Sequence, residues 1–195
     1  PGYISNRLTG RKYMQTNGTN AEATDSALHY DFMNGVYNST GSISNYHGYM
    51  WKRAFSYFDC VGFLGTGSAR TVSHNLGVVP EMFWCKSRDS TESWAVFHKN
   101  IGNGFQTVLN QANVPLSDST SYNNTDPTSS VFTVGTNDQL NKSGDNYIAY
   151  LFATVDGISK VGSCSHTFGG GDTNVDCGFS NGCRFLLIKS TTHAY

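Results

Sequence analysis

The stretch Asn146-Tyr147-Ile148-Ala149-Tyr150-Leu151-Phe152-Ala153-Thr154 decides the fold class. It alternates along its length and gathers three aromatic side chains, which is typical of a central β-strand. A related stretch, Asn45-Tyr46-x-x-Tyr49-Met50-Trp51, occurs about 101 residues earlier, and such an internal match indicates a tandem repeat.

Further matches follow in the same order with a nearly constant offset, interrupted by a two-residue insertion at Ser180-Asn181-Gly182. The matched pairs are Val61-Gly62 with Val161-Gly162, Phe32 with Phe132, Gly35 with Gly135, Gly77 with Gly178, and Met82–Ser87 with Phe185–Ser190. We therefore expect residues 45–88 to superpose on 146–190, with Tyr46, Tyr49, Val61 and Gly77 on their counterparts.

The positions of the matched residues along the chain predict that it consists of three parts. Residues 1–55 form the C-terminal part of a preceding unit, residues 56–156 form a complete β unit, and residues 157–195 form the N-terminal part of the next. Because the matches begin and stop in the middle of a unit, we expect the chain to be a fragment of a longer array.

The composition favours short strands joined by tight turns. Charged residues are only 14% of the chain, whereas aromatic residues reach 13% and glycine occurs 21 times. Enough apolar bulk is present for a core, which excludes a charge-rich disordered tail. A net charge of -1 gives no basic face for nucleic acid. The apolar runs are too short to cross a bilayer, so we expect no membrane insertion.

The complete unit is predicted to be β throughout, because no stretch combines helical periodicity with a cap over three turns. Residues 117–130 are predicted to be a polar surface loop. The predicted strands are 58–64, 70–74, 81–86, 94–98, 107–110, 131–134 and 146–154, with 81–86 and 94–98 forming a hairpin. We therefore expect an all-β fold of tandem β-sandwich or jelly-roll-like units of about 100 residues.

Five cysteines are expected to be free thiols. Cys85 aligns with Ile188 and Cys177 with Leu76, and a residue that exchanges with Leu or Ile is a buried apolar filler. The alternative is a metal site at Cys164, His166, Cys177 and Cys183, but it lacks a C-x-x-C pair. We predict no metal and no cofactor.

Several segments resemble a known family. They are Phe58-Asp59-Cys60-Val61-Gly62-x-x-Gly65-Thr66-Gly67, Val72–Met82, Pro127–Gly135 and Tyr147–Ala153. Together they resemble a repeated β domain of uncharacterised function found in tail-fibre and structural virion proteins of tailed phages, notably marine and cyanobacterial ones. The resemblance covers most of residues 45–190 and departs at Ser180-Asn181-Gly182, where Val79-Pro80-Glu81 would stand. It implies location in a virion assembled in the host cytoplasm.

Residues that could suggest catalysis have simpler explanations. Glu81 and Asp59 are not retained in the second copy, and a glycan hydrolase would need two carboxylates at a fixed separation. Ser73 and His74 are adjacent in a strand and therefore point to opposite faces. Gly65-x-Gly67 lacks the helix that a phosphate-binding loop requires. We predict no catalytic residues and no enzyme activity.

The candidate ligand-binding residues are Trp94 and three residues of the Asn- and Asp-rich loop 117–126, namely Tyr122, Asn123 and Asn124. Exposed aromatic faces and amide groups suit hydroxyl-rich ligands, and loops on a rigid sandwich are a usual place for binding. The partner that these residues predict is a glycan of the host surface.

The function predicted is that of a non-enzymatic phage structural protein, a segment of a tail fibre or appendage that supports host attachment. The alternatives are a capsid decoration protein and, from another class, a glycan-binding lectin-like module. Partners are other virion proteins and further copies of the chain, as a trimer by family resemblance. A physical reason for self-association is aromatic bulk in excess of one small core. These aromatic residues are Phe55, Tyr57, Phe58, Phe63, Phe83 and Trp84.

Overall fold

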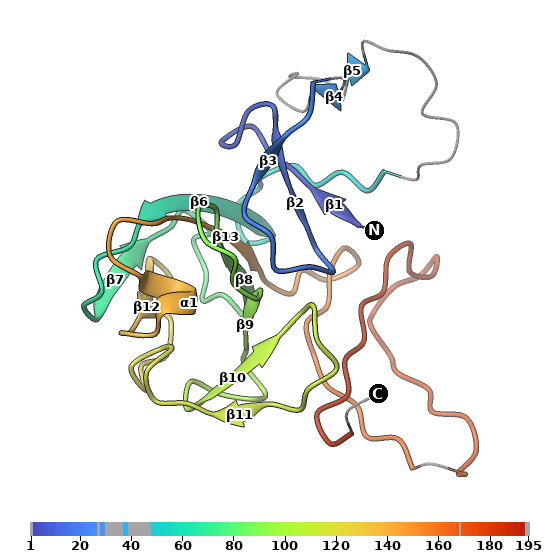
Figure 1. Cartoon of the computed structure of the whole chain (residues 1–195). Helices are drawn as coiled ribbons and strands as arrows, with labels where there is room; N and C mark the ends of the chain where they lie inside the picture. Colours follow the sequence, from blue (N-terminus) through green and yellow to red (C-terminus); the bar gives the residue numbers. More distant parts are fainter. Residues whose placement is uncertain (1, 27, 30–36, 39–47, 168, 194–195) are drawn as a thin grey trace.

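The computed structural model describes residues 2–26, 28–29, 37–38, 48–167 and 169–193. Their regular secondary structure is antiparallel β, apart from a single four-residue helix among the described residues, and loops and turns join the short strands (Figure 1). The all-β fold class predicted from the sequence is therefore confirmed.

The elements follow the chain in a simple order. They are β1 (Tyr3–Ile4), β2 (Lys12–Gln15), β3 (Ala23–Thr24), β4 (Leu28–His29), β5 (Tyr37–Asn38), β6 (Phe58–Leu64), β7 (Arg70–Ser73), β8 (Met82–Ser87), β9 (Ala95–His98), β10 (Phe105–Val108), β11 (Leu116–Ser117), β12 (Val131–Val134), α1 (Asp138–Asn141) and β13 (Asn146–Phe152). The strands predicted within residues 56–156 are all present. The strand predicted at 107–110 is displaced by two residues and the strand predicted at 81–86 by one, and three others are one or two residues shorter than predicted.

The main sheet has six strands in the order β11-β10-β9-β8-β13-β6. Strand β13 lies inside it, with Tyr150 opposite Cys60 of β6 on one side and Trp84 of β8 on the other. The predicted hairpin is confirmed, because β8 and β9 pair with Phe83 opposite Phe97. The stretch 146–154, predicted to be a central strand, is thus an interior strand with a neighbour on each side.

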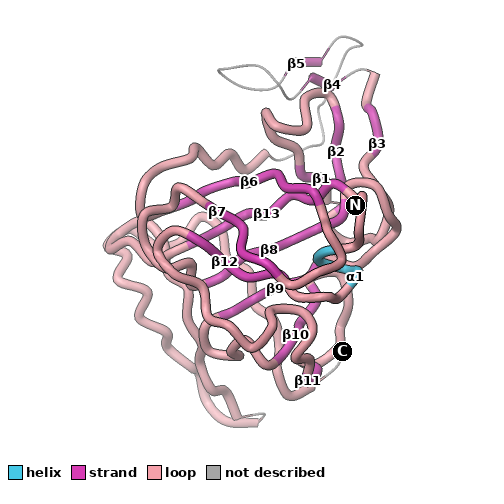
Figure 2. Tube along the Cα trace, turned by 90° about the vertical axis from the view of Figure 1, so that its left-hand side faces the viewer, coloured by secondary structure: helices cyan, strands magenta, loops and turns pink. Residues whose placement is uncertain are grey.

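The sheet buries both of its faces. Alternate residues of β13 belong to different clusters, with Tyr147 and Leu151 in one and Ile148 and Tyr150 in the other. The first cluster is closed by the two-stranded β7–β12 sheet through Val72 and by α1 (Figure 2). This second layer gives the unit its sandwich-like form.

The N-terminal segment covers the opposite face. Met14 of β2 is 1% exposed and packs in the same cluster as Tyr150 and Trp94. The Trp94 indole donates to the Gln15 carbonyl at 2.8 Å, and the Asn6 amide donates to the Tyr150 hydroxyl at 2.6 Å. The described N-terminal strands β1 to β3 therefore belong to the same packed body as the six-stranded sheet, across the boundary predicted at residue 55.

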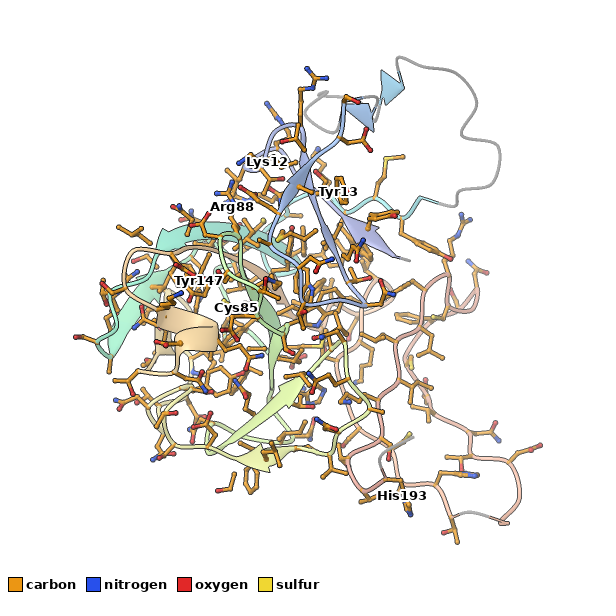
Figure 3. All side chains as sticks on the ribbon, viewed as in Figure 1. Lys12, Tyr13, Cys85, Arg88, Tyr147 and His193 are labelled. Atoms are coloured by element: carbon orange, nitrogen blue, oxygen red, sulfur yellow. The ribbon has the colours of Figure 1, made fainter. Side chains whose placement is uncertain are left out.

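An ion pair holds the same segment at the end of β8. Glu22 accepts from Arg88 Nε at 2.9 Å and from Lys12 Nζ at 2.7 Å. In Figure 3, Lys12 and Arg88 lie where the N-terminal segment meets the sheet, while Cys85 and Tyr147 lie within the body. The Glu22 side chain is only 7% exposed, so this contact is partly desolvated.

One turn of the structure occurs twice, 101 residues apart. The amides of Tyr57 and Phe58 donate to the Ala54 carbonyl at 3.1 Å, and the amides of Ile158 and Ser159 donate to the Val155 carbonyl at 2.9 Å. Each turn also forms an isolated antiparallel bridge, between Ala54 and Phe58 or between Val155 and Ser159. The third residue of each has a positive φ, 64° at Ser56 and 72° at Gly157.

Other predicted counterparts lie in different elements. Met82–Ser87 is strand β8, whereas Phe185–Ser190 is not assigned to a strand. Tyr49 likewise lies outside the strands, although its counterpart Tyr150 is in β13. A segment needs hydrogen-bonded neighbours to form a strand, and β8 has β9 and β13 beside it. The counterparts Tyr46, Phe32 and Gly35 lie outside the described residues.

The predicted surplus of aromatic bulk is largely absorbed by the two cores. Of the six aromatic residues cited above, Phe58, Phe83 and Trp84 are buried and only Phe55 is strongly exposed, at 75%. A second core, which the N-terminal segment closes, accounts for much of the aromatic bulk that was taken as a reason for self-association. All five cysteines are unpaired, as predicted. Cys85 is fully buried, as its alignment with Ile188 predicted, whereas Cys177 is only half-buried despite its alignment with the buried Leu76.

Candidate functional site

The side chain of Asp59, the first candidate acid, is engaged in contacts within the fold. It is 2% exposed in β6, and its carboxylate accepts from the backbone amides of Cys60 at 2.8 Å and Asn75 at 2.7 Å. Arg53 pairs with the same carboxylate. These contacts tie β6 to the turn after β7 and leave little of the carboxylate for chemistry.

His74 also has both ring nitrogens engaged. Its Nδ1 accepts from the Leu76 amide at 3.2 Å, so Nε2 carries the proton and donates to the Thr128 carbonyl at 3.1 Å. Burial lowers the pKa of His74, which favours this neutral form. Ser73 is exposed while His74 is buried, which confirms the prediction that they face opposite sides.

Glu81, which directly precedes β8, joins that strand to Thr154, two residues after the end of β13. Its carboxylate pairs with Lys99 at 2.6 Å and accepts from the Thr154 amide at 3.0 Å and hydroxyl. Burial alone would raise the pKa of Glu81, but the hydrogen bonds from Lys99 and Thr154 outweigh it and lower the pKa. A carboxylate held ionised in this way is poorly suited to act as a general acid.

Sequence reasoning did not identify Lys86, a fully buried lysine in β8. Its Nζ donates to the carbonyls of Ser87 at 2.7 Å and Ser90 at 3.1 Å. Burial lowers the pKa of Lys86 to about 8. Such an amine can serve as a nucleophile, but here its hydrogen bonds fix it to the turn that follows its own strand, which is a structural role.

The expectation that Trp94 and Tyr122 are exposed is wrong. They are 0% and 1% exposed, and the Tyr122 ring meets Phe83 and Phe97 edge-on. Trp94 directly precedes β9 and faces the N-terminal segment, so both rings belong to the cores. The loop predicted to lie on the surface also turns inward at Ser121 and Tyr122, which are buried. The Ser121 hydroxyl donates a hydrogen bond to the Asp118 carboxylate of the same loop.

Asn123 and Asn124 are exposed, as the sequence predicted. Both have a positive φ, 51° and 48°, a conformation that Asn tolerates better than most residues. They form a tight turn after the buried Tyr122. The structure therefore separates the four predicted ligand residues into two buried aromatic residues and two turn residues.

A different polar cavity lies beside the β10–β11 edge of the sheet. It has a volume of about 210 Å³ and is bounded by β10, β11, the loop between them and α1. Val108, Val114 and Leu116 supply its apolar part. Its polar lining consists of Ser93, Gln106, Thr107, Gln111, Asn113 and Gln139.

Three of these residues carry a buried polar atom without a hydrogen-bond partner: Gln106 Nε2, Thr107 Oγ1 and Gln139 Nε2. Gln111 and Asn113 are instead linked, because Gln111 donates to Ser93 at 2.9 Å and accepts from Asn113 at 2.8 Å. The sequence signal that was missed is the density of amide side chains between 106 and 113. Gln139 could not have been added to it, because only the fold brings α1 to the cavity.

An apolar surface lies where the C-terminal segment meets residues 49–51. Phe185 packs against Tyr49 and Trp51, with ring centroids 5.4 Å and 5.5 Å apart. Met50 is 77% exposed and Ile188 is 73% exposed. Apolar side chains gathered on a surface in this way commonly mark a site of association.

Within the described ranges, no three His, Cys, Asp or Glu side chains are placed to hold a metal ion. No helix in the described part of the chain is long and apolar enough to span a bilayer.

Comparisons with known proteins identify the family. Neither the curated proteins nor the solved structures contain a match to this chain. A family model does match residues 10–195, a span that crosses all three parts predicted from the sequence. The chain therefore belongs to the family described as domain of unknown function (DUF7483).

Proposed function

We propose that this protein is a non-enzymatic structural protein built from tandem β units of about 100 residues. In this proposal it forms a segment of a tail fibre or similar appendage of a phage virion and supports host attachment. Each unit adds length while contacting mainly its neighbours, which suits an elongated part.

The observation that carries the proposal is the repeated turn. Residues 54–58 and 155–159 share their hydrogen-bond pattern, their isolated bridge and a left-handed third residue. The first turn leads into β6, and the second follows β13 at the predicted boundary between units. Gly77 and Gly178, also 101 residues apart, have positive φ values of 80° and 72° and support the same register.

A contact between distant segments gives further support. In the complete unit, Phe152 of β13 lies opposite Met82 of β8. The predicted counterparts of these residues are Trp51 and Phe185, and their rings are in contact. We propose that residues 185–190 are the β8 strand of another unit and pair with residues 48–51 in the register of β8 with β13.

A non-enzymatic role agrees with the state of the candidate catalytic groups. Asp59, His74 and Glu81 are each held by backbone or side-chain contacts within the fold. The carboxylates of Asp59 and Glu81 stabilise loops next to the sheet. Their positions are explained by the fold without a substrate.

Self-association, as a trimer by family resemblance, belongs to the same proposal. The apolar surface around Met50 and Ile188 offers the area that such contacts need. Equilibrium sedimentation over a range of concentrations should show a mass above that of one chain. A stable monomer at all concentrations would contradict self-association but would leave the repeated unit in place.

Electron microscopy of intact particles tests the location. Antibody raised against this chain should label thin appendages of a phage that encodes it. Label spread over the capsid faces would favour the alternative of a capsid decoration protein. Particles without label would contradict a virion location.

A further inference from the structure

We propose that the cavity beside the β10–β11 edge is a binding site for a neutral, hydroxyl-rich ligand, namely a monosaccharide unit. The proposal concerns residues other than the predicted Trp94, Tyr122, Asn123 and Asn124, and it does not depend on the tandem-unit proposal.

The unpartnered polar atoms are the first argument. Buried polar atoms are normally hydrogen-bonded, and each exception requires an explanation. Among the described side chains, six buried nitrogen or oxygen atoms have no partner in the protein, and three of the six belong to residues that line this one cavity, Gln106, Thr107 and Gln139. Thr107 is 5% exposed and belongs to β10, so its hydroxyl is held on a rigid element.

The chemistry of the lining selects the class of ligand. No charged side chain lines the cavity, so an ion that entered would lose hydration without gaining an opposite charge. Primary amides and hydroxyls offer both donors and acceptors, as the hydroxyl groups of a sugar do. The side chains of Val108, Val114 and Leu116 can cover the C–H face of a sugar ring.

The geometry is suited to selective binding of a small molecule. A volume of about 210 Å³ is below the range of drug-sized ligands, which indicates a single sugar unit. The linked side chains of Ser93, Gln111 and Asn113 form one wall. Gln106 and Thr107 come from β10 and Gln139 comes from α1, so three separate segments converge on the ligand.

The cavity also adjoins the C-terminal segment. Lys189 Nζ donates to the backbone carbonyl of Gln111 at 2.7 Å. This contact fixes one end of the wall without adding a charged group to the lining. Residues 185–190, the predicted counterpart of β8, therefore also support the cavity.

The experiment is a titration followed by amide nuclear magnetic resonance. Glucose, galactose and N-acetylglucosamine are added separately to the whole chain, well above about 1 mM, the range of weak but specific binding. We expect at least one sugar to shift the side-chain amide signals of Gln106, Gln111 and Gln139 in a saturable way. The signals of Asn123 and Asn124 should not move.

Variants assign the binding to the cavity. Thr107→Val keeps the shape of the side chain and removes its hydroxyl, so affinity should fall about tenfold. Thr133→Val, at a buried threonine of β12 outside the cavity, is the matched control and should bind like the parent. If Thr107→Val does not fold, Gln139→Leu in α1 is used instead, and it should lower the affinity for the sugar in the same way.

Two results would overturn the proposal. One is the absence of a saturable shift with all three sugars. The other is binding that Thr107→Val or Gln139→Leu leaves unchanged, which would place the sugar elsewhere.

Discussion

Asn141 illustrates how single polar side chains stabilise this fold. It is fully buried at the end of α1, and its Oδ1 accepts from the Thr66 amide at 2.9 Å. Its Nδ2 donates to the carbonyls of Ser68 and Gly135, both at 2.7 Å. One amide thus joins the loop after β6 to the loop before α1.

Replacing Asn141 by Leu should destabilise the protein by about 3 kcal/mol, because buried backbone groups would be left without partners. Urea unfolding followed by tryptophan fluorescence measures this loss. The matched control is Asn100→Ala, at an exposed position, which should change the free energy of unfolding by less than about 0.5 kcal/mol. Equal effects of the two substitutions would show that the buried network contributes little.

Lys86 predicts a pH dependence of stability. Its pKa is about 8 in the folded chain, below the value of about 10.4 expected when unfolded. Between these values the unfolded chain binds more protons, so the Lys86 contribution makes the fold more stable as pH rises. The gain across the window is on the order of 2–3 kcal/mol.

Lys86→Met isolates this contribution, since other groups titrate in the same range. Unfolding free energies of the parent and the variant are compared at pH 7.5 and pH 10. Relative to Lys86→Met, the parent should become more stable at the higher pH. If the difference in unfolding free energy between the parent and Lys86→Met were the same at both pH values, this would contradict a lowered pKa of Lys86.

The main sheet could be predicted at the scale of elements because its signals are local. Alternation and aromatic residues in 146–154 marked β13, and β6 and β12 were predicted at their observed bounds. The docking of β2 was not predicted, because no local pattern says which distant surface Met14 will cover. The cavity was missed for the same reason, since Gln139 joins Gln106 and Thr107 only in the folded chain.

The packing of β2 makes a prediction for the N-terminal segment. Met14→Ala should cost about 2–4 kcal/mol of stability, because it removes a fully buried side chain from the cluster around Trp94 and Tyr150. Met50→Ala is the control, since Met50 is 77% exposed and should be nearly neutral. Thermal unfolding of both variants gives the comparison. Similar midpoints would mean that β1 to β3 are only loosely attached.

At the scale of the whole molecule, the proposed repeat rests on matching turns, because the predicted counterparts of the strands do not match. The turns at 54–58 and 155–159 match because their geometry is set locally, by hydrogen bonds within five residues. Phe185–Ser190 and its counterpart β8 differ because a strand depends on neighbours that the local sequence does not provide. Sequence matching alone therefore could not say which of the proposed copies would form a complete sheet.

Disulfide trapping tests the proposed pairing of residues 185–190 with residues 48–51. Cysteine pairs are placed at positions 50 and 186, or 49 and 187, which correspond to facing residues of β13 and β8. Adjacent facing pairs alternate in Cα separation, so at least one should suit a disulfide. The background carries serine at the native cysteines outside the core, Cys164, Cys177 and Cys183.

The most direct measurement is the rate of disulfide formation within single chains under mild oxidation, followed by intact mass and gel mobility. The proposed tandem units predict that an in-register pair, Met50→Cys with Leu186→Cys or Tyr49→Cys with Leu187→Cys, closes faster than the out-of-register pair Met50→Cys with Ile188→Cys. Equal rates for all pairs, or faster closure of the out-of-register pair, would contradict the claim that residues 185–190 repeat β8.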